Sequence, residues 1–244
     1  MDEPRDIDSM NLRDPMVVRC TQPEDQCENG DHFIVPLGTS RRGRLRFTNS
    51  AHQVVIRANS HIRDLCRARF GDRMPTILVQ GGVVTIRYPR VPFCDWLNYR
   101  SESPAEVELN VRIPWDIEVH GGASKLVADL RELRLGSFSL EGGASRLEVE
   151  LPKPVGTVAV VILGGASNVA IRRPEGVAAR LRVSGGATSL KFDHRSIGAA
   201  GGEPDLRDRE YDGAADRYDV AVTGGANNLS IDEQRATRGL GTSA

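Results

Sequence analysis

Aromatic residues are scarce in this sequence: two Trp, four Tyr and six Phe make up 5% of its 244 residues. The interior must therefore be filled mainly by Val, Leu, Ile and Ala, which suits a narrow core. No apolar stretch approaches the ~18 residues that a membrane-spanning helix needs. Residues 1–6 lack the basic-then-apolar order of a signal peptide. Taking Met1 as the native start, we expect a cytoplasmic protein with no membrane partner.

No charge of one sign dominates the chain. Its 32 Lys and Arg residues against 33 Asp and Glu residues give a net charge of −1. Such a surface has no strong basic field to attract nucleic acid or anionic lipid. The concentrated basic run Arg41-Arg42-Gly43-Arg44 is short and is offset by acidic residues elsewhere. We therefore expect no nucleic-acid partner.

Cysteine is also infrequent, and the four residues Cys20, Cys27, Cys66 and Cys94 form no CxxC pair. Cys20 and Cys27 with His32 do not have the spacing of a zinc ribbon, so free thiols are the better interpretation. A phosphate-binding loop is excluded because no Gly-Gly pair is followed by Lys-Ser or Lys-Thr. The sequence predicts no metal, no cofactor and no cofactor-binding residue.

What the sequence has in abundance is one short motif, Gly-Gly-Ala-Ser, and its variants. Four successive copies, which begin at Gly121, Gly142, Gly164 and Gly185, are separated by 21, 22 and 21 residues. Self-similarity at such a period is typical of repeat architectures. Five clear copies and two weaker ones begin, in that order, at Gly121, Gly142, Gly164, Gly185 and Gly224, and at Asn49 and Gly81.

Apolar and polar residues alternate on both sides of each motif. With the first residue of the motif as position 0, positions −4, −2, +5 and +7 are apolar in every copy, and the intervening positions are largely polar. In the Gly142 copy they are Phe138, Leu140, Leu147 and Val149. A period of two is the pattern of a strand with one buried face. Each copy therefore predicts two short strands joined through the glycine pair.

The buried parity shifts between positions +2 and +5, so the chain must turn there. We expect the first glycine of each pair to point inward at a tight corner that leaves no room for a side chain. The second glycine suits a conformation with positive φ.

Short strands that return every 21 or 22 residues cannot each bury their own face, but stacked on their neighbours they form a continuous core. The sequence therefore predicts an all-β fold, a single-stranded parallel β-solenoid of about seven coils with long loop insertions. An antiparallel β-sandwich is the alternative, but it does not explain identical corner residues in register.

The domain organisation follows from the extent of the repeat. We expect a flexible polar arm at 1–30, the β-solenoid domain at 31–232 and a flexible tail at 233–244, with residues 31–48 capping the first coil. Three insertions are expected at about 58–76, 89–105 and 193–217. The alternation of Cys66, Ala68 and Phe70 favours an added strand in the first, rather than a helical turn.

The other two insertions are interpreted as covers. Phe93, Trp96 and Tyr99 make the second insertion aromatic, and shielding of a flank is favoured over a ligand site. The third insertion is a candidate cover for Val161 and Leu163, which occupy nominally outward positions.

Two segments carry a resemblance to a known family: Val119-His120-Gly121-Gly122-Ala123-Ser124 and Leu163-Gly164-Gly165-Ala166-Ser167-Asn168-Val169. Over roughly residues 40–232 the chain resembles bacterial β-solenoid domains with Gly-Gly repeats, which are of unknown function and are often labelled "putative adhesin". The resemblance implies a parallel β-helix, usually right-handed. It implies no catalytic residues.

An enzyme would need acids and bases that converge on one lateral face. Asp116, Glu118 and His120 share an outward row, and stacking would bring His120 near Glu141 and Ser139 in a relay-like arrangement. Outward positions of strands are ordinarily polar, however, and fold analogy alone does not make a site. We therefore predict no catalytic residue, and a non-enzymatic scaffold or interaction module with an unknown protein partner. The alternatives are a carbohydrate-active β-helix enzyme (lyase or hydrolase) and a cell-surface adhesin.

The two ends of a solenoid differ in protection. The last coil, around Leu229-Ser230-Ile231, is followed only by a short polar segment. An open strand edge is a template for pairing. The sequence therefore predicts that a homodimer, if formed, pairs through the C-terminal coil.

Overall fold

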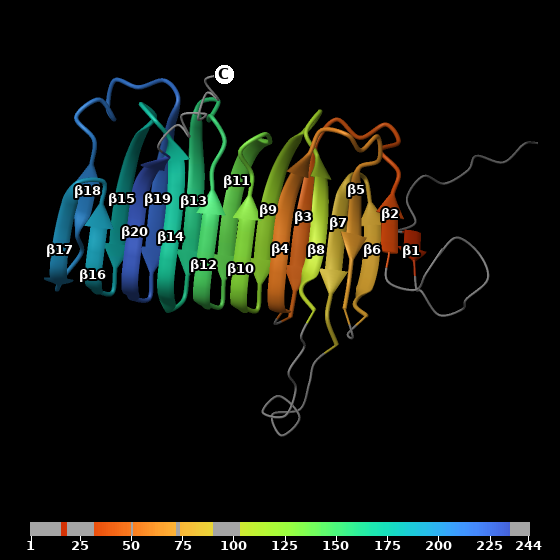
Figure 1. Cartoon of the computed structure of the whole chain (residues 1–244), viewed down its shortest axis with the longest axis horizontal. Helices are drawn as coiled ribbons and strands as arrows, with labels where there is room; N and C mark the ends of the chain where they lie inside the picture. The colour runs from red at the N-terminus through yellow and green to blue at the C-terminus, as the bar shows by residue number, and fades with distance from the viewer. Residues whose placement is uncertain (1–15, 19–31, 50, 72–73, 90–102, 235–244) are drawn as a thin grey trace, which may run out of the picture.

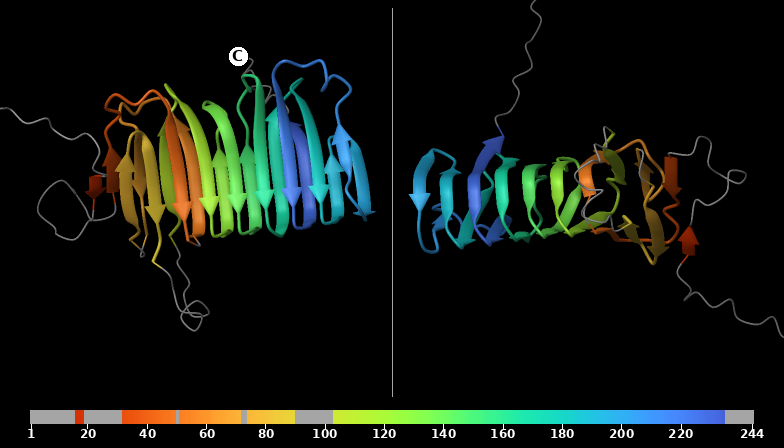
Figure 2. Two further views of the ribbon diagram at one scale, coloured as in Figure 1. Left: turned by 180° about the vertical axis from the view of Figure 1, so that it is seen from behind. Right: turned by 90° about the horizontal axis from the view of Figure 1, so that it is seen from below.

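The computed structural model describes residues 16–18, 32–49, 51–71, 74–89 and 103–234. Within these ranges the chain forms strands, turns and loops and no helix, so the all-β prediction is confirmed. The strands build two ten-stranded sheets. The sheets face each other along the length of the molecule (Figure 1, Figure 2).

Sheet A contains the strand that enters the corner at Asn49 and at each of the five clear Gly-Gly copies. The Gly81 copy is not such a corner, because it joins two antiparallel strands, Thr76–Gln80 and Val83–Arg87, that both belong to this sheet, so the coil expected there is not formed. In spatial order the members of sheet A are β1 (Met16–Val18), β6 (Thr76–Gln80), β7 (Val83–Arg87), β3 (Gly43–Thr48), β9 (Pro114–His120), β11 (Arg134–Glu141), β13 (Thr157–Leu163), β19 (Arg217–Thr223), β15 (Ala178–Ser184) and β18 (Asp205–Arg207).

Sheet B contains the strand that leaves each corner. Its members in spatial order are β17 (Arg195–Ala200), β16 (Ala187–Phe192), β20 (Ala226–Gln234), β14 (Ala166–Pro174), β12 (Ala144–Glu150), β10 (Ala123–Asp129), β4 (Ala51–Asn59), β8 (Ala105–Asn110), β5 (Cys66–Arg69) and β2 (His32–Val35).

The central part of each sheet is parallel and its ends are antiparallel. In sheet A the strands from β7 to β15 pair in parallel, and in sheet B those from β16 to β8 do so. The outer strands β1, β6 and β18, and β17, β5 and β2, pair antiparallel. Reversed strands therefore close both ends of the stack.

The spatial order of the strands departs from their order in the chain. After β16 the chain runs through β17 and β18 and then doubles back. As a result β19 lies between β13 and β15, and β20 lies between β14 and β16 (Figure 1). At the other end β3 lies between β7 and β9, and β4 between β8 and β10. The prediction that each coil simply follows the last is wrong at both ends.

This order also corrects the expected position of the open edge. Ser230 on β20 lies opposite Ala170 on one side and Lys191 on the other. The backbone of the C-terminal coil is thus paired on both sides, and it is no template for another chain. The outermost strands of the two sheets are β1, β18, β17 and β2.

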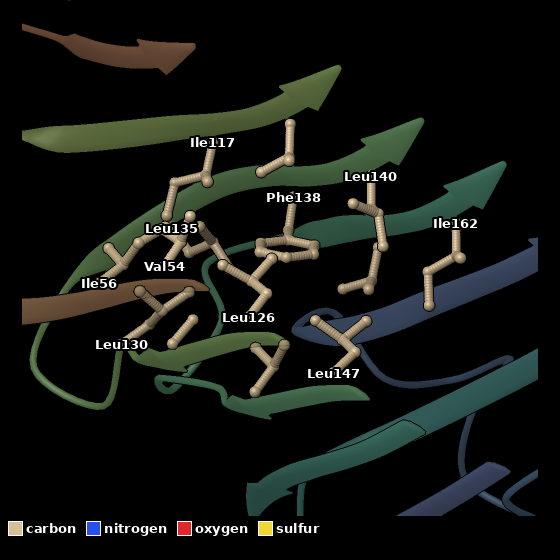
Figure 3. Packing of buried hydrophobic residues seen from close by; sticks show 14 of the residues in the cluster. Val54, Ile56, Ile117, Leu126, Leu130, Leu135, Phe138, Leu140, Leu147 and Ile162 are labelled. Carbon is tan, nitrogen blue, oxygen red and sulfur yellow. The ribbon is translucent and has the colours of Figure 1, made fainter. Parts of the chain in front are cut away.

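The core lies between the two sheets and follows the predicted alternation. Phe138 and Leu140 of β11 are fully buried, as are Leu126 of β10 and Leu147 of β12. Figure 3 shows these side chains from the two sheets pointing toward one another. Aliphatic side chains fill most of the space, as the low aromatic content indicates.

The glycine corners differ from expectation in one respect. Gly142, the first of its pair, is exposed rather than inward, while Gly143 is buried, and both have positive φ (103° and 84°). The crowding comes from the neighbouring coil: a Cβ on Gly143 would lie 2.4 Å from the carbonyl oxygen of Gly165. Hydrogen bonds continue around the bend, since Gly142 N donates to Leu163 O (2.8 Å) and Ala144 N to Gly165 O (3.2 Å).

Several predicted segments take a different place. Residues 16–18 of the expected arm form β1, and residues 233 and 234 of the expected tail belong to β20, which extends to Gln234. Of the expected cap 31–48, β2 is at an outer edge but β3 is internal. The added strand in the first insertion is confirmed as β5. The rest of the arm, residues 235–244 and the aromatic loop at 90–102 lie outside the described residues.

The third insertion does not serve as the expected cover. Residues 193–217 contain β17 and β18, which pair with the edges of β16 and β15 at the end of the stack. They leave Leu163 40% exposed. The segment closes the end of the molecule instead of its face.

The alternation predicts opposite effects for neighbouring residues. Val149 and Ile171 are each 1% exposed, so Val149→Asp or Ile171→Asp buries an unpaired carboxylate at a cost of several kcal/mol, or about 3–5. We expect either variant to unfold. Glu148→Lys, on the outer side of the same strand as Val149, is expected to be nearly silent in thermal melting. Equal losses of Tm for inner and outer changes would contradict the alternation.

At the glycine corner, we predict that adding a Cβ destabilises the fold more through its clash with the neighbouring coil than through the positive φ of the backbone. In Gly143→Ala the new Cβ meets the backbone of Gly165, and we expect a loss of about 2–4 kcal/mol by chemical denaturation. Gly156→Ala is the matched control, because Gly156 also has positive φ (73°) but has nothing within 4 Å of the added Cβ. It should lose only about 1 kcal/mol. Equal losses in the two variants would show that coil-on-coil contact is unimportant.

Candidate functional site

The outer face of sheet A carries the residues that the sequence singled out. Because its strands pair in register, outward side chains form rows that cross the strands. The middle row consists of Arg46, Glu118, Ser139, Val161, Ala221, Arg182 and Asp205. On one side of it the lower row consists of Arg44, Asp116, Ser137, Ala159, Asp219, Arg180 and Arg207. On the other side the upper row consists of His120, Glu141, Leu163, Thr223 and Ser184.

Asp116 is the most buried acidic group of this face. It was expected to point outward, but its side chain is only 4% exposed because Arg42 lies over it. Arg42 donates two hydrogen bonds to Asp116, from Nε at 2.9 Å and from Nη2 at 2.7 Å, and Ser137 Oγ donates a third at 3.1 Å. Gly136 leaves room for this pair, since a Cβ there would lie 2.6 Å from Asp116 Oδ1.

The same contacts set the protonation of Asp116. Burial alone would raise its pKa, but the hydrogen bonds from Arg42 and Ser137 and the charges of Arg42 and Arg44 outweigh it and hold the pKa below its usual value. The carboxylate is therefore ionised and occupied by its partners, which leaves it unsuited to general acid or base catalysis near neutral pH.

Glu118, His120 and Glu141 form a second group beside it. Arg46 Nε donates to Glu118 Oε2 at 2.7 Å, and Arg44 Nε lies 3.3 Å from Glu118 Oε1. His120 Nδ1 is 2.8 Å from Glu141 Oε2, and its Nε2 is 3.5 Å from Glu118 Oε2. The predicted proximity of His120 and Glu141 is confirmed, but the second partner is Glu118 on its own strand. Ser139 is opposite Glu118 in the pairing.

An apolar stripe follows on β13, at the centre of the face. Its members are Ala159, Val161 and Leu163, of which Ala159 and Leu163 are exposed and Val161 is half-buried. On the two neighbouring strands the outward residues are mostly small and uncharged, including Ser139 and Ala221. The stripe and its two neighbouring strands thus form a flat, largely uncharged area, and charged side chains lie on the strands to either side of it.

Ion pairs return on the far side of the stripe. Arg182 Nη2 pairs with Asp219 at 2.9 Å, and Arg180 Nη2 with Asp205 at 2.5 Å. The latter pair connects β15 to the antiparallel strand β18. These pairs are exposed, so each contributes little to the stability of the fold. Their main effect is to fix which sign of charge stands at which place.

A separate polar cluster lies at the ends of the coils away from the glycine corners, and the sequence analysis did not predict it. Arg173 is 1% exposed, and its guanidinium lies 2.7 Å from Asp193, 2.9 Å from Asp208 and 3.0 Å from Glu233. Burial raises the pKa of Asp193, and the nearby Asp208 and Glu233 add to that, although Arg173 opposes it. These ion pairs connect β14 with the segment 193–217 and with β20.

The sequence did contain a signal for this cluster. Arg173 stands at position +9 of its repeat, where the two preceding copies have Leu130 and Leu151, both buried. Glu233 stands at the same position of the last copy and is paired with Arg173 in register. A buried arginine at a position that otherwise holds leucine requires an acidic partner. Glu233 at the same position of the last copy indicates that the last coil lies next to the coil of Arg173.

Other reactive groups give no second site among the described residues. Cys66 is buried, and burial together with the charge of Asp64 raises the pKa of its thiol to about 12, so the thiol is unreactive at neutral pH. No group of three or more His, Cys, Asp or Glu side chains in these ranges is arranged to hold a metal ion. Cys20 and Cys27, the sulfur members of the considered metal set, lie outside the described residues.

In the part of the chain that the structure describes, no helix has the length and apolar character needed to cross a membrane.

Comparisons with known proteins give a partial family match and a solved structure of similar fold. Residues 81–172 match the model of the N-terminal domain of toast_rack, DUF2154, which covers less than half of the chain. No curated protein matches. A crystal structure described as a "putative cell adhesion protein" from Clostridium sporogenes ATCC 15579 has a TM-score of 0.66 at 16% identity over 84% of this chain and 98% of that one.

A second solved structure is a more distant match. It is described as a "putative adhesin" from Bacteroides fragilis NCTC 9343, with a TM-score of 0.28 and 10% identity over 83% of this chain and 95% of that one. The Clostridium structure is similar in fold, and at 16% identity the likeness extends to the fold alone.

The Arg42–Asp116 pair predicts a pH-dependent contribution to stability. A carboxyl whose pKa is lowered by folding stabilises the native state above its unfolded pKa of about 3.9, and this is lost as the pH falls through the folded value. Arg42→Gln should therefore lower the Tm at pH 7, and its difference from wild type should narrow below about pH 4. Arg41→Gln, at the exposed neighbouring residue, is the control. A difference that is constant with pH would contradict the assignment.

Proposed function

We propose that this chain is a non-enzymatic interaction domain, built as a right-handed β-solenoid, that binds another macromolecule through the outer face of sheet A. The observation that carries the proposal is the apolar stripe on β13, an internal strand of a large sheet, in which Leu163 is 40% exposed. A flat apolar centre within a charged border is the usual anatomy of a protein interface. Single exposed apolar residues are common, but a contiguous stripe on one strand indicates a contact surface.

The polar groups of the face support binding rather than catalysis. Asp116 and Glu118 are each held by arginines, at 2.7 Å from Arg42 and Arg46 respectively. Groups that are already neutralised and lie on a flat sheet do not converge on a reacting atom. Adhesion, the role named for the Clostridium structure, is one form that such an interaction takes. The cytoplasmic location expected from the sequence stays a prediction.

The alternative with a specific observation in its favour is a carbohydrate-active enzyme. His120 Nδ1 lies 2.8 Å from Glu141 Oε2 on the next coil. A histidine held by a carboxylate is the arrangement that orients an imidazole as a general base.

The proposal predicts that binding depends on the stripe. Beads coated with the protein would be tested on surfaces coated with the same protein, collagen, mucin or peptidoglycan, and retention compared between wild type and variants. Val161→Lys should reduce retention about tenfold or more, which is a loss of ~1.4 kcal/mol. Ala170→Lys is the matched control, because Ala170 is a half-buried residue in the middle of the outer face of sheet B, in the same coil.

The competing outcome is turnover. Panels of glycan and ester substrates would be incubated with the wild type, with His120→Ala and with Glu141→Gln. We expect no turnover above buffer with any of them. Robust turnover that either substitution abolishes, in variants that keep the wild-type Tm, would replace the interaction domain with an enzyme.

A further inference from the structure

The charges in the middle row of the outer face of sheet A are arranged antisymmetrically about β13. Along the middle row the order is Arg46, Glu118, Ser139, Val161, Ala221, Arg182 and Asp205. Two strands from Val161, the row has Glu118 on one side and Arg182 on the other. Three strands from Val161, it has Arg46 on the first side and Asp205 on the second. Reflection about Val161 therefore exchanges the sign of every charge in this row.

We propose that the macromolecule bound by this face is a second copy of the chain, packed face to face about a two-fold axis that runs along β13. The inference rests on the proposed function, and it names the partner. A two-fold axis in this direction places each residue of the row opposite its mirror position in the other copy. Val161 then faces Val161 of the second copy, and Leu163 faces its own equivalent. Glu118 faces Arg182, and Arg46 faces Asp205.

The opposite orientation of the second copy is disfavoured by the same row. If the two-fold axis ran along the row, every strand would face itself. Glu118 would then oppose Glu118, and Arg182 would oppose Arg182. Like charges placed opposite each other across an interface cost several kcal/mol. The middle row therefore selects one of the two symmetric orientations, which a surface built for an unrelated partner would not need to do.

The neighbouring rows add less to this choice. In the lower row Asp116 faces Arg180, but Arg42 covers Asp116 and neutralises it, and Ser137 faces Asp219. The like-charged pair is Arg44 with Arg207, and both have partners within their own chain: Arg44 pairs with Glu118 at 3.3 Å, and Arg207 with Asp212 at 2.8 Å. In the upper row Glu141 faces Thr223 and His120 faces Ser184, and neither contact is repulsive.

The geometry of packed sheets allows these contacts. Face-to-face sheets lie ~10 Å apart with strand directions within ~30°, and strands are spaced ~4.8 Å apart. Glu118 and Arg182 are each two strands from β13, or ~10 Å from the axis, so a 30° crossing displaces them by only ~5 Å, which long side chains can span. Both remain accessible, at 19% and 49% side-chain exposure.

The size of the surface predicts a dimer of limited strength. From β3 to β18 there are seven strands, a width of ~29 Å, and three outward rows give a height of ~20 Å. The contact would bury ~600 Å² per copy, somewhat below the ~800 Å² of a standard interface. The apolar centre supplies most of the affinity, and the charged border fixes the orientation. We therefore expect a concentration-dependent equilibrium between monomer and dimer.

The test measures self-association of the whole chain by sedimentation equilibrium up to about 1 mM, where an affinity of ~4 kcal/mol is still detected. Wild type and the sheet B control Ala170→Lys should form dimers, and Val161→Lys should weaken association at least tenfold. A wild type that is monomeric throughout this range overturns the inference, as does a dimer indifferent to Val161→Lys. If Val161→Lys still abolishes bead retention in a strictly monomeric protein, the proposed function stands and only the identity of the partner fails.

Charge reversal tests the orientation. Arg182→Glu places two acidic groups opposite each other at both symmetric contacts, and Glu118→Arg places two basic ones, so each variant alone should associate at least tenfold more weakly. An equimolar mixture of the two restores both contacts, and native mass spectrometry should show mainly the mixed dimer. Failure of the mixture to recover overturns the orientation and with it the inference. If Glu118→Arg does not fold, Arg46→Glu mixed with Asp205→Arg provides the same test one strand further out.

Discussion

The stack depends on the backbone contact between successive glycine corners. Around each bend the amides of one coil donate to the carbonyls of the next, and a Cβ on Gly142, Gly143 or Gly164 would lie within 3.0 Å of neighbouring backbone. Coils can approach to the strand spacing at the bend only where no side chain intervenes. This contact fixes the register of both sheets at once, because the strand that enters the corner and the strand that leaves it are set by the same pair of residues.

The register has consequences on both sides of each sheet. Inside, it stacks Phe138, Leu140 and Leu147 against their equivalents in adjacent coils and builds a continuous core. Outside, it places charged side chains in rows, so that Arg46 meets Glu118, and His120 meets Glu141. The polar contacts on this face are therefore products of the repeat. A repeat that aligns apolar residues for stability therefore also sets the pattern of charge on the outer face of the sheet.

Strand positions, burial and the His120–Glu141 contact could be predicted from the sequence, since each depends on alternation within a repeat or on neighbouring copies. The spatial order of the coils could not. Near-identical copies offer near-identical edges, so the alternation alone does not say whether β14 pairs with β16 or with β20. Arg173 and Glu233 indicate the answer, because their ion pair at 3.0 Å forms only when their coils are adjacent. The burial of Asp116 was also missed, because Arg42 approaches it from 74 positions away in the chain.

The doubling back of the chain after β18 separates the order of synthesis from the order of assembly. When β15 and β16 have emerged from a ribosome, the coil that belongs between them and β13–β14 has not yet been made. The exposed edge of β14 then has β16 as the only completed repeat ahead of it, with the same glycine corner and the same alternation. Pairing at that moment closes the place that β19 and β20 later occupy, and the final structure requires that place to be open. This protein therefore cannot be built coil by coil from its N-terminus, as a repeat of uniform order can. The coil of β19 and β20, although made after that of β15 and β16, lies inside it in the stack.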